Sequence, residues 1–186
     1  MKRLLIFLFA ALFIAAPANA QSAAAPAAAP IPAAAPSDVN SLDSIMKAVY
    51  DVISGDAGEP RNWDRFRSLF HKDARLIPTG KNQQTGLTGA RASTPDEYAR
   101  SAGSYFATNG FHEREIARRV DQYGNIAQVF STYEAYSSRT EKKPMLRGIN
   151  SFQLLFDGQR WWVMTIYWQQ ETPDNIIPKK YMKTVK

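Results

Sequence analysis

The segment from Arg147 to Glu171, RGINSFQLLFDGQRWWVMTIYWQQE, constrains the fold of this 186-residue chain more than any other. It contains two runs of β-branched and aromatic residues around Asp157-Gly158, a dipeptide that favours a two-residue hairpin turn because both turn positions accept positive φ. A turn of this length pairs Asn150 with Thr165 across the hairpin. Both faces then carry large apolar side chains, so each face must be covered by another part of the molecule or by a partner.

The two faces of this hairpin differ in polarity. One face is apolar near the turn and gains polar atoms at its far end, from Asn150, Thr165 and Tyr167, as expected for a closed core that opens into a cavity. The other face is predicted to contact a partner subunit, because exposed apolar patches of that extent are unusual on soluble monomers. Its candidate contact residues are Leu155, Trp162, Met164, Ile166 and Trp168.

Residues 1–20 have the pattern of a signal peptide. Two basic residues precede an apolar run from Leu4 to Ala16, and the small residues Ala18 and Ala20 stand where a signal peptidase reads the chain. The apolar run is too short to span a bilayer as a helix. The sequence therefore predicts export to the periplasm or the external medium, cleavage after Ala20, and a mature form without a membrane span.

The remaining chain divides into three parts. Residues 21–36 are almost wholly alanine and proline and are predicted to form an exposed linker, followed by one domain over residues 37–171 and a basic C-terminal tail over residues 172–186. The absence of cysteine excludes a cysteine-linked lipid anchor, disulfides and thiol chemistry. After loss of the leader, 21 of the 23 basic residues remain against 17 acidic ones. Because they are dispersed, no nucleic-acid partner is expected.

Three helices are predicted before the long strands. The first has apolar residues at a 3.6-residue period from Leu42 to Ile53, with Ser37 available as its cap. Asn62 is predicted to cap a short second helix, and a brief strand over residues 74–79 follows. Thr94 to Glu97 has the pattern of a capping box, which predicts the start of a third helix.

A second hairpin is predicted from Phe111 to Ser138, with a turn at Gly124-Asn125. A two-residue turn gathers most of the apolar residues on one face and places Arg114 on that cavity face. It also puts Glu115 opposite Glu134, a like-charge pair that is mildly unfavourable. In this register no Asp or Glu of the four long strands faces the cavity.

The order of helix, helix, short strand, helix and four long antiparallel strands indicates an α+β fold. Together with WDRFRSLFHKDARLIPTG, YGNIAQVFSTYE and SFQLLFDGQRWWVMTIYW, this order resembles the nuclear transport factor two-like (SnoaL-like) superfamily over residues 37–171, and in particular its exported bacterial members without an assigned activity. The resemblance implies a cone-shaped fold with three N-terminal helices packed in a strongly curved, mainly antiparallel sheet. It also implies a cavity at the wide end and often a homodimer across the outer sheet face, but no particular reaction.

Several polar side chains are expected on the cavity side of such a fold. The candidate contacts for a small-molecule ligand are Tyr50, Tyr98, Tyr105, Arg114, Arg118, Tyr133, Asn150, Thr165 and Tyr167. Each also has a plainer structural explanation, such as a cross-strand hydrogen bond, a satisfied core hydroxyl or an ion pair. The spacing of the two histidines predicts no metal site, and the lack of a phosphate-binding glycine loop predicts no nucleotide cofactor.

Three functions fit this sequence, and the sequence alone does not decide whether the protein is an enzyme. The first is a module that binds a small, partly apolar ligand in the cavity between helices and sheet. The second is a cofactor-independent acid–base enzyme of the isomerase, cyclase or dehydratase type, for which only Asp73, His71 or His112 could supply the base in the predicted register. The third is a structural dimerisation module.

Overall fold

The structure, a computed structural model, describes residues 30–82 and 84–184; the predicted signal peptide and most of the linker lie outside them. The helices are α1 (Pro36–Val39), α2 (Leu42–Ile53), α3 (Trp63–Ser68), α4 (Pro95–Phe106) and the 3₁₀ helix η1 (Lys179–Tyr181). The strands are β1 (Phe70–Lys81), β2 (Thr88–Ala90), β3 (His112–Tyr123), β4 (Ile126–Tyr136), β5 (Leu146–Phe156) and β6 (Trp161–Gln170). In this described part no helix is long and apolar enough to cross a membrane.

Each of the three longer helices begins at a side chain that accepts a hydrogen bond from a backbone amide of the first turn. Ser41 caps α2 in this way, rather than the predicted Ser37, because α1 is a separate short helix. Asn62 caps α3 as predicted. The predicted capping box of α4 is confirmed, with reciprocal hydrogen bonds of 3.2 and 2.7 Å between Thr94 and Glu97.

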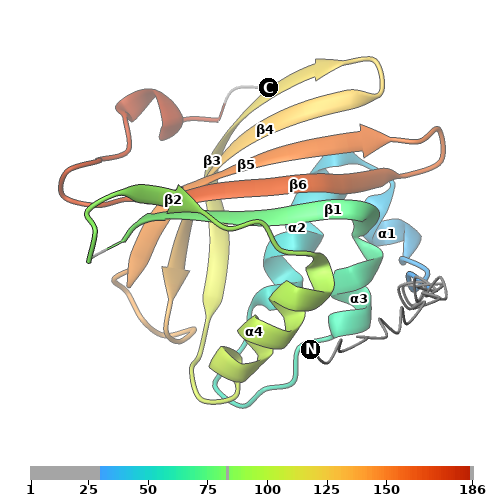
Figure 1. Ribbon diagram of the computed structural model, residues 1–186. Helices are drawn as coiled ribbons and strands as arrows, with labels where there is room; N and C mark the ends of the chain where they lie inside the picture. Colours follow the sequence, from blue (N-terminus) through green and yellow to red (C-terminus); the bar gives the residue numbers. More distant parts are fainter. Residues whose placement is uncertain (1–29, 83, 185–186) are drawn as a thin grey trace, which may run out of the picture.

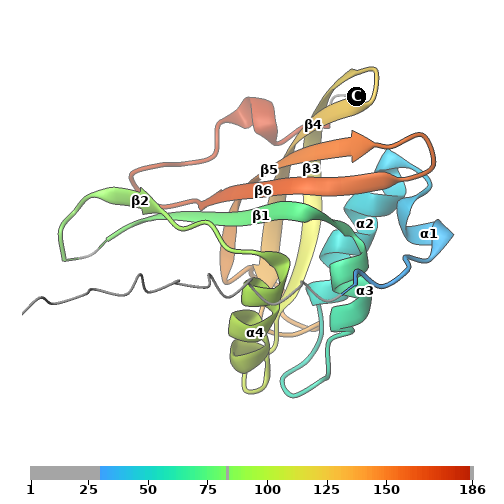
Figure 2. The same cartoon turned by 45° about the vertical axis from the view of Figure 1, so that its right-hand side comes forward.

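The six strands form one curled sheet with the order β2-β1-β6-β5-β4-β3. All neighbouring strands are antiparallel except β1 and β6, which are parallel. Figures 1 and 2 show the sheet curving over the helices, with α2 in its hollow and α3 and α4 beneath β1. The predicted α+β class and the curved, mainly antiparallel sheet are confirmed.

The hairpin of β5 and β6 has a register that differs from the predicted one. Its turn contains four residues, so Phe156 lies opposite Trp161. Farther along, Met164 is an extra residue that forms a β-bulge. Asn150 consequently lies opposite Trp168.

This bulge exchanges the two faces of β6 beyond it, because one added residue reverses an alternation of period two. Ile166 is buried and Trp168 packs against the core, so their predicted place on the partner face is wrong. Thr165 and Tyr167 lie on the outer face, where Tyr167 is 47% exposed, so their predicted place in the cavity is also wrong.

A second bulge, at Ile116, has the same effect on β3. The predicted pairing is correct between the turn and the bulge, but beyond it Arg114 lies opposite Glu134 on the outer side of the sheet. Glu113 and Glu115 now face the helices. The expectation that Arg114 faces the cavity and that no strand carboxylate does is therefore wrong.

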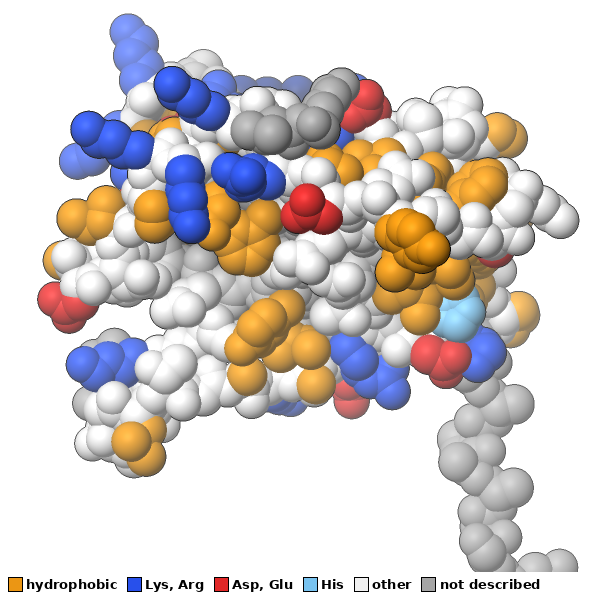
Figure 3. All heavy atoms as spheres, turned by 90° about the horizontal axis from the view of Figure 1, so that it is seen from above, with side chains coloured by type: hydrophobic (Ala, Val, Ile, Leu, Met, Phe, Trp, Pro, Cys, Tyr) orange, Lys and Arg blue, Asp and Glu red, His pale blue; other side chains and the backbone are white. Residues whose placement is uncertain are grey.

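Residues 171–184, which we call the C-terminal strap, cross the outer face of the sheet (Figure 1). At one end Glu171 Oε1 accepts a 2.9 Å hydrogen bond from Ile177 N. At the other end Thr132 Oγ1 donates a 2.6 Å hydrogen bond to the Tyr181 carbonyl, and the Tyr181 ring packs on Phe130. In Figure 3, which views this face, basic side chains gather around the strap and apolar patches lie beside them.

Candidate functional site

The hollow between helices and sheet contains a cavity of about 340 Å³. Its walls come from α2, α3, α4 and the inner sides of β1, β3, β4, β5 and β6, and most of the wall atoms belong to aliphatic and aromatic side chains. The polar wall groups are fewer: Tyr50, Thr79, Tyr98, Glu113, Tyr133, Asn150 and Gln170. A small apolar space with few polar groups is the usual composition of a small-molecule site.

Glu113 places a carboxylate in the wall of this cavity. Its Oε1 accepts a 3.0 Å hydrogen bond from Asn150 Nδ2, and its other oxygen has no hydrogen-bond partner among the described residues. Burial raises the pKa of Glu113 to about 7, and the hydrogen bond from Asn150 opposes this shift only in part. Both protonation states of Glu113 are therefore accessible near neutral pH.

Two tyrosines near Glu113 present hydroxyl groups to the same cavity. Burial raises the pKa of Tyr98 and of Tyr133, and the negative charge of Glu113 raises both further. Each phenol therefore remains protonated around neutral pH. Neither hydroxyl makes a hydrogen bond within the part of the chain that the structure describes, so each can donate one to a ligand.

The close approach of Tyr133 to β5 requires a glycine. A Cβ atom on Gly148 would lie 2.5 Å from the Tyr133 hydroxyl oxygen and 2.5 Å from the carbonyl oxygen of Gln169. Gly148 thereby leaves the space that the Tyr133 hydroxyl occupies in the cavity wall.

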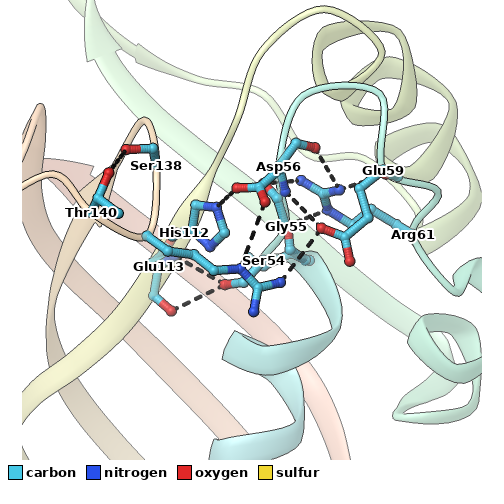
Figure 4. A network of polar contacts seen from close by, with 11 residues as sticks. Ser54, Gly55, Asp56, Glu59, Arg61, His112, Glu113, Ser138 and Thr140 are labelled. Carbon is cyan, nitrogen blue, oxygen red and sulfur yellow. Dashed lines mark hydrogen bonds and ion pairs between the residues drawn. The ribbon is translucent and has the colours of Figure 1, made fainter.

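Several hydrogen bonds made by side chains hold the start of β3, which carries Glu113 (Figure 4). Ser54 Oγ, at the end of α2, accepts a 3.0 Å hydrogen bond from Glu113 N. The following loop wraps around the buried Arg61 guanidinium, which donates hydrogen bonds to three carbonyl groups of the loop and to that of Ile53. His112 Nε2 lies 2.7 Å from Asp56 Oδ1 and ties the same loop to β3. These hydrogen bonds tie the backbone at Glu113 to the end of α2 and to the loop that follows it.

The same carboxylate also borders a second, open groove of about 860 Å³ between α2, β3 and the loop after β4. This groove is polar, with side chains of both charges, and it shares Tyr50 and Glu113 with the inner cavity. Glu113 therefore lies at the boundary between a mainly apolar cavity and an open polar groove. The described residues contain no group of three or more His, Cys, Asp or Glu side chains able to hold a metal ion.

The structure brings four of the predicted ligand contacts together. Tyr50, Tyr98, Tyr133 and Asn150 line the inner cavity, although their contact with a ligand stays a prediction. Arg118 lies on the inner side of β3 but is engaged by carboxylates rather than facing the cavity.

The remaining predicted contacts lie elsewhere. Tyr105 is 47% exposed on α4 and does not reach the cavity, because Tyr98 and Phe106 occupy the inward side of that helix. Arg114 pairs with Glu134 at 3.0 Å on the outer side. Thr165 and Tyr167 face outward as described above.

Glu113 was missed because the bulge at Ile116 could not be seen in the alternation of residues. One signal was present in the sequence. The predicted register opposes Glu115 and Glu134, whereas the extra residue replaces that repulsion with an Arg114–Glu134 ion pair.

Comparison with solved structures shows which fold this is. A protein of unknown function with a cystatin-like fold from Nostoc punctiforme PCC 73102 superposes with a TM-score of 0.54 over 71% of this chain and 90% of that chain, at 9% identity. An uncharacterised protein with a cystatin-like fold from Caulobacter vibrioides gives 0.51 over 73% and 90%, at 12% identity. This chain shares their fold, the cystatin-like fold of nuclear transport factor 2-like proteins.

Another solved structure with a similar fold has a described role. The beta subunit of a proposed aromatic-ring-hydroxylating dioxygenase from Novosphingobium aromaticivorans DSM 12444 superposes with a TM-score of 0.55 over 72% of this chain and 88% of that chain, at 14% identity. At such identities the likeness concerns the fold alone. No protein-family model and no curated protein matches the chain.

Proposed function

We propose that this protein is a cofactor-independent acid–base enzyme that acts on a small, mainly apolar molecule bound in the inner cavity. The observation that carries this proposal is Glu113, whose carboxylate faces an apolar cavity with one oxygen unpaired and a pKa of about 7. A general base works best when its pKa lies near the working pH. A half-buried carboxylate with no ion-pair partner otherwise costs the fold stability.

The proposed reaction is removal of a proton from a carbon next to a carbonyl group. Glu113 takes the proton through its free oxygen, and the negative charge that develops on the carbonyl oxygen is stabilised by hydrogen bonds from Tyr98 and Tyr133. Return of the proton from Glu113 to another carbon completes an isomerisation. Departure of a leaving group from the neighbouring carbon completes an elimination instead.

The second candidate function is binding of such a molecule without turnover. It is favoured by the cavity volume of about 340 Å³ and by the two unpaired phenol hydroxyls, which suit a ligand with one polar group. We also propose that the protein acts after export, because residues 1–20 have the features of a signal peptide.

Proton exchange on carbon tests the proposed function directly. The protein from residue 21 onward would be incubated in D₂O with cyclic saturated and β,γ-unsaturated ketones, and deuterium incorporation followed by NMR. Glu113→Gln should slow exchange by a factor of roughly 100 or more. Asp121→Asn, which also replaces a carboxylate by an amide but at an exposed position outside the cavity and the groove, should not.

The tyrosines offer a second matched pair for this assay. Tyr133→Phe removes a cavity hydroxyl and should slow exchange, whereas Tyr105→Phe removes an exposed one and should not. Ligand binding without exchange, or equal exchange in wild type and Glu113→Gln, would reject catalysis by Glu113.

A further inference from the structure

A chain of hydrogen bonds runs behind Glu113, from one carboxylate to another. Asn150 Nδ2 lies 3.0 Å from Glu113 Oε1 and 3.1 Å from the Tyr50 hydroxyl oxygen. The Tyr50 hydroxyl lies 2.7 Å from Ser131 Oγ, and Ser131 Oγ donates to Glu115 Oε1 at 2.6 Å. Tyr50, Ser131 and Asn150 are all buried, so this chain is shielded from water.

Arg118 anchors the far end of the hydrogen-bond chain. Its Nε donates to Glu115 Oε2 at 2.7 Å, its Nη2 contacts the same oxygen, and its Nη1 reaches Asp43 Oδ1 at 2.8 Å. A guanidinium can only donate hydrogen bonds, and an ionised carboxylate can only accept them. Glu115 is therefore held as an acceptor at both oxygens.

The direction of every hydrogen bond in the chain follows from this anchor. Ser131 has one hydroxyl proton and gives it to Glu115, so the hydrogen between Ser131 and Tyr50 must come from Tyr50. The Tyr50 oxygen can then only accept from its other neighbour. Asn150 supplies that hydrogen from its amino group, and its second N–H points at Glu113.

We propose that Glu115 is a positioning residue for Glu113: its carboxylate fixes the direction of the hydrogen-bond chain and so holds the amino group of Asn150 against the Glu113 carboxylate. The inference rests on the proposed role of Glu113 as the proton-transfer group. One consequence concerns Tyr50, whose proton is committed to Ser131 and is not offered to a ligand, unlike those of Tyr98 and Tyr133.

Glu115→Gln separates this role from simple electrostatics. Because Arg118 can only donate, it holds the new side chain with its amide oxygen toward Arg118 and its amino group toward Ser131. Ser131 then donates to Tyr50, Tyr50 donates to Asn150, and the Asn150 amide turns its oxygen toward Glu113. That arrangement favours a protonated Glu113.

Loss of charge and reversal of the hydrogen-bond chain predict opposite shifts in the pKa of Glu113. Loss of a nearby negative charge alone would lower the pKa of Glu113, whereas reversal of the chain raises it. The other titratable or charged groups that line the cavity and groove beside Glu113 are unchanged in Glu115→Gln. They are Lys47, Tyr50 and Asp51 on α2, Tyr98 on α4, Tyr133 and Tyr136 on β4, His112, Arg114 and Arg118 on β3, and Arg139, Glu141 and Lys142 in the loop after β4.

The measurement is the titration of glutamate carboxyl carbons by NMR, with the Glu113 signal assigned by its absence in Glu113→Gln. Glu115→Gln should move the Glu113 midpoint up by about one pH unit. Tyr50→Phe, which breaks the chain without changing the charge, should also raise it. Adding Glu115→Gln to Tyr50→Phe should give no further rise, because the link between positions 115 and 150 is already absent.

A lower midpoint in Glu115→Gln, or an equal change in the presence and absence of the Tyr50 hydroxyl, would overturn the proposal. Tyr50→Phe alone keeps the test decisive if Glu115→Gln does not fold, since an unchanged midpoint in that variant rejects the chain. The titration requires no substrate. If only the proposed enzymatic function is wrong, no deuterium exchange is seen while the Glu113 midpoint shifts in the variants as expected. If only the positioning role is wrong, exchange is seen while the Glu113 midpoint does not shift as expected.

Discussion

The Asn150 side chain on β5 donates a 3.0 Å hydrogen bond to Glu113 on β3, although β4 runs between their two strands. The contact is possible because the sheet is strongly curved and because the bulge at Ile116 turns Glu113 inward. The hydrogen bond joins Asn150, which the sequence predicted on the cavity side, to Glu113, which it did not.

Glu113→Gln is expected to stabilise the protein above pH 7. The pKa of Glu113 lies near 7 in the folded state and near 4.5 in the unfolded state, so the folded state binds the proton more tightly. The stability of the wild type should therefore fall as pH rises from about 4.5 to 7 and stay lower above that window. Chemical denaturation at pH 8 should show a gain of roughly 1–3 kcal/mol for the variant, and at pH 4.5 almost none.

The control for this prediction is Glu141→Gln, at an exposed position in the loop after β4. Its pH dependence of unfolding should follow that of the wild type. If Glu113→Gln also follows the wild type, Glu113 is not protonated more readily in the folded state.

Gly148→Ala should destabilise the domain by about 1–3 kcal/mol, because the new methyl group overlaps both the Tyr133 hydroxyl and the backbone carbonyl of Gln169. Gly89→Ala is the matched control, since a Cβ atom there meets nothing within 4 Å. Thermal denaturation of both variants measures the difference. Equal midpoints would mean that β5 and β6 can separate locally without cost.

Thr94→Ala should cost about 1 kcal/mol of unfolding free energy, because the backbone amide of Glu97 loses its acceptor at the start of α4. Ser104→Ala, within the same helix, removes a hydroxyl that bonds only the preceding turn at 3.2 Å and should change stability by less than about 0.5 kcal/mol. Urea denaturation of the pair tests whether the capping box contributes to the stability of the whole domain.

The structure leaves a smaller part of the outer face available for the predicted homodimer contact. Ile126, Leu155 and Trp162 lie in one row across β4, β5 and β6, and Ile126 is 60% exposed, whereas the C-terminal strap contacts Phe130 and Thr132 farther along. We expect two chains per particle in sedimentation at micromolar concentration, with the row of each subunit facing that of the other.

Changing Leu155 and Trp162 together to Glu should yield single chains, while Lys143→Glu, in the exposed loop before β5, should leave the assembly intact. A wild type that sediments as a single chain would show that the strap and the solvent suffice to cover this face.

The sequence predicted the presence of the helices and hairpins better than it predicted the strand register beyond the two bulges, away from the turns. The capping residues Asn62 and Thr94 act locally, so their chemistry is visible in a few neighbouring residues. The bulges at Ile116 and Met164 are not visible in this way, because both residues are apolar and fit a regular strand equally well. Only packing against the helices decides between Glu113 and Arg114 as the inward residue.

The bulge at Ile116 also affects how this chain is compared with distant proteins of the same fold. At 9–14% identity, an alignment that matches residues by their place along a strand pairs Glu113 with a side chain on the opposite side of the sheet wherever the other protein lacks the extra residue. Side chains of such proteins should be matched by the direction in which they point. A carboxylate one position away in the other chain can then be the true counterpart of Glu113, even where aligned letters show none.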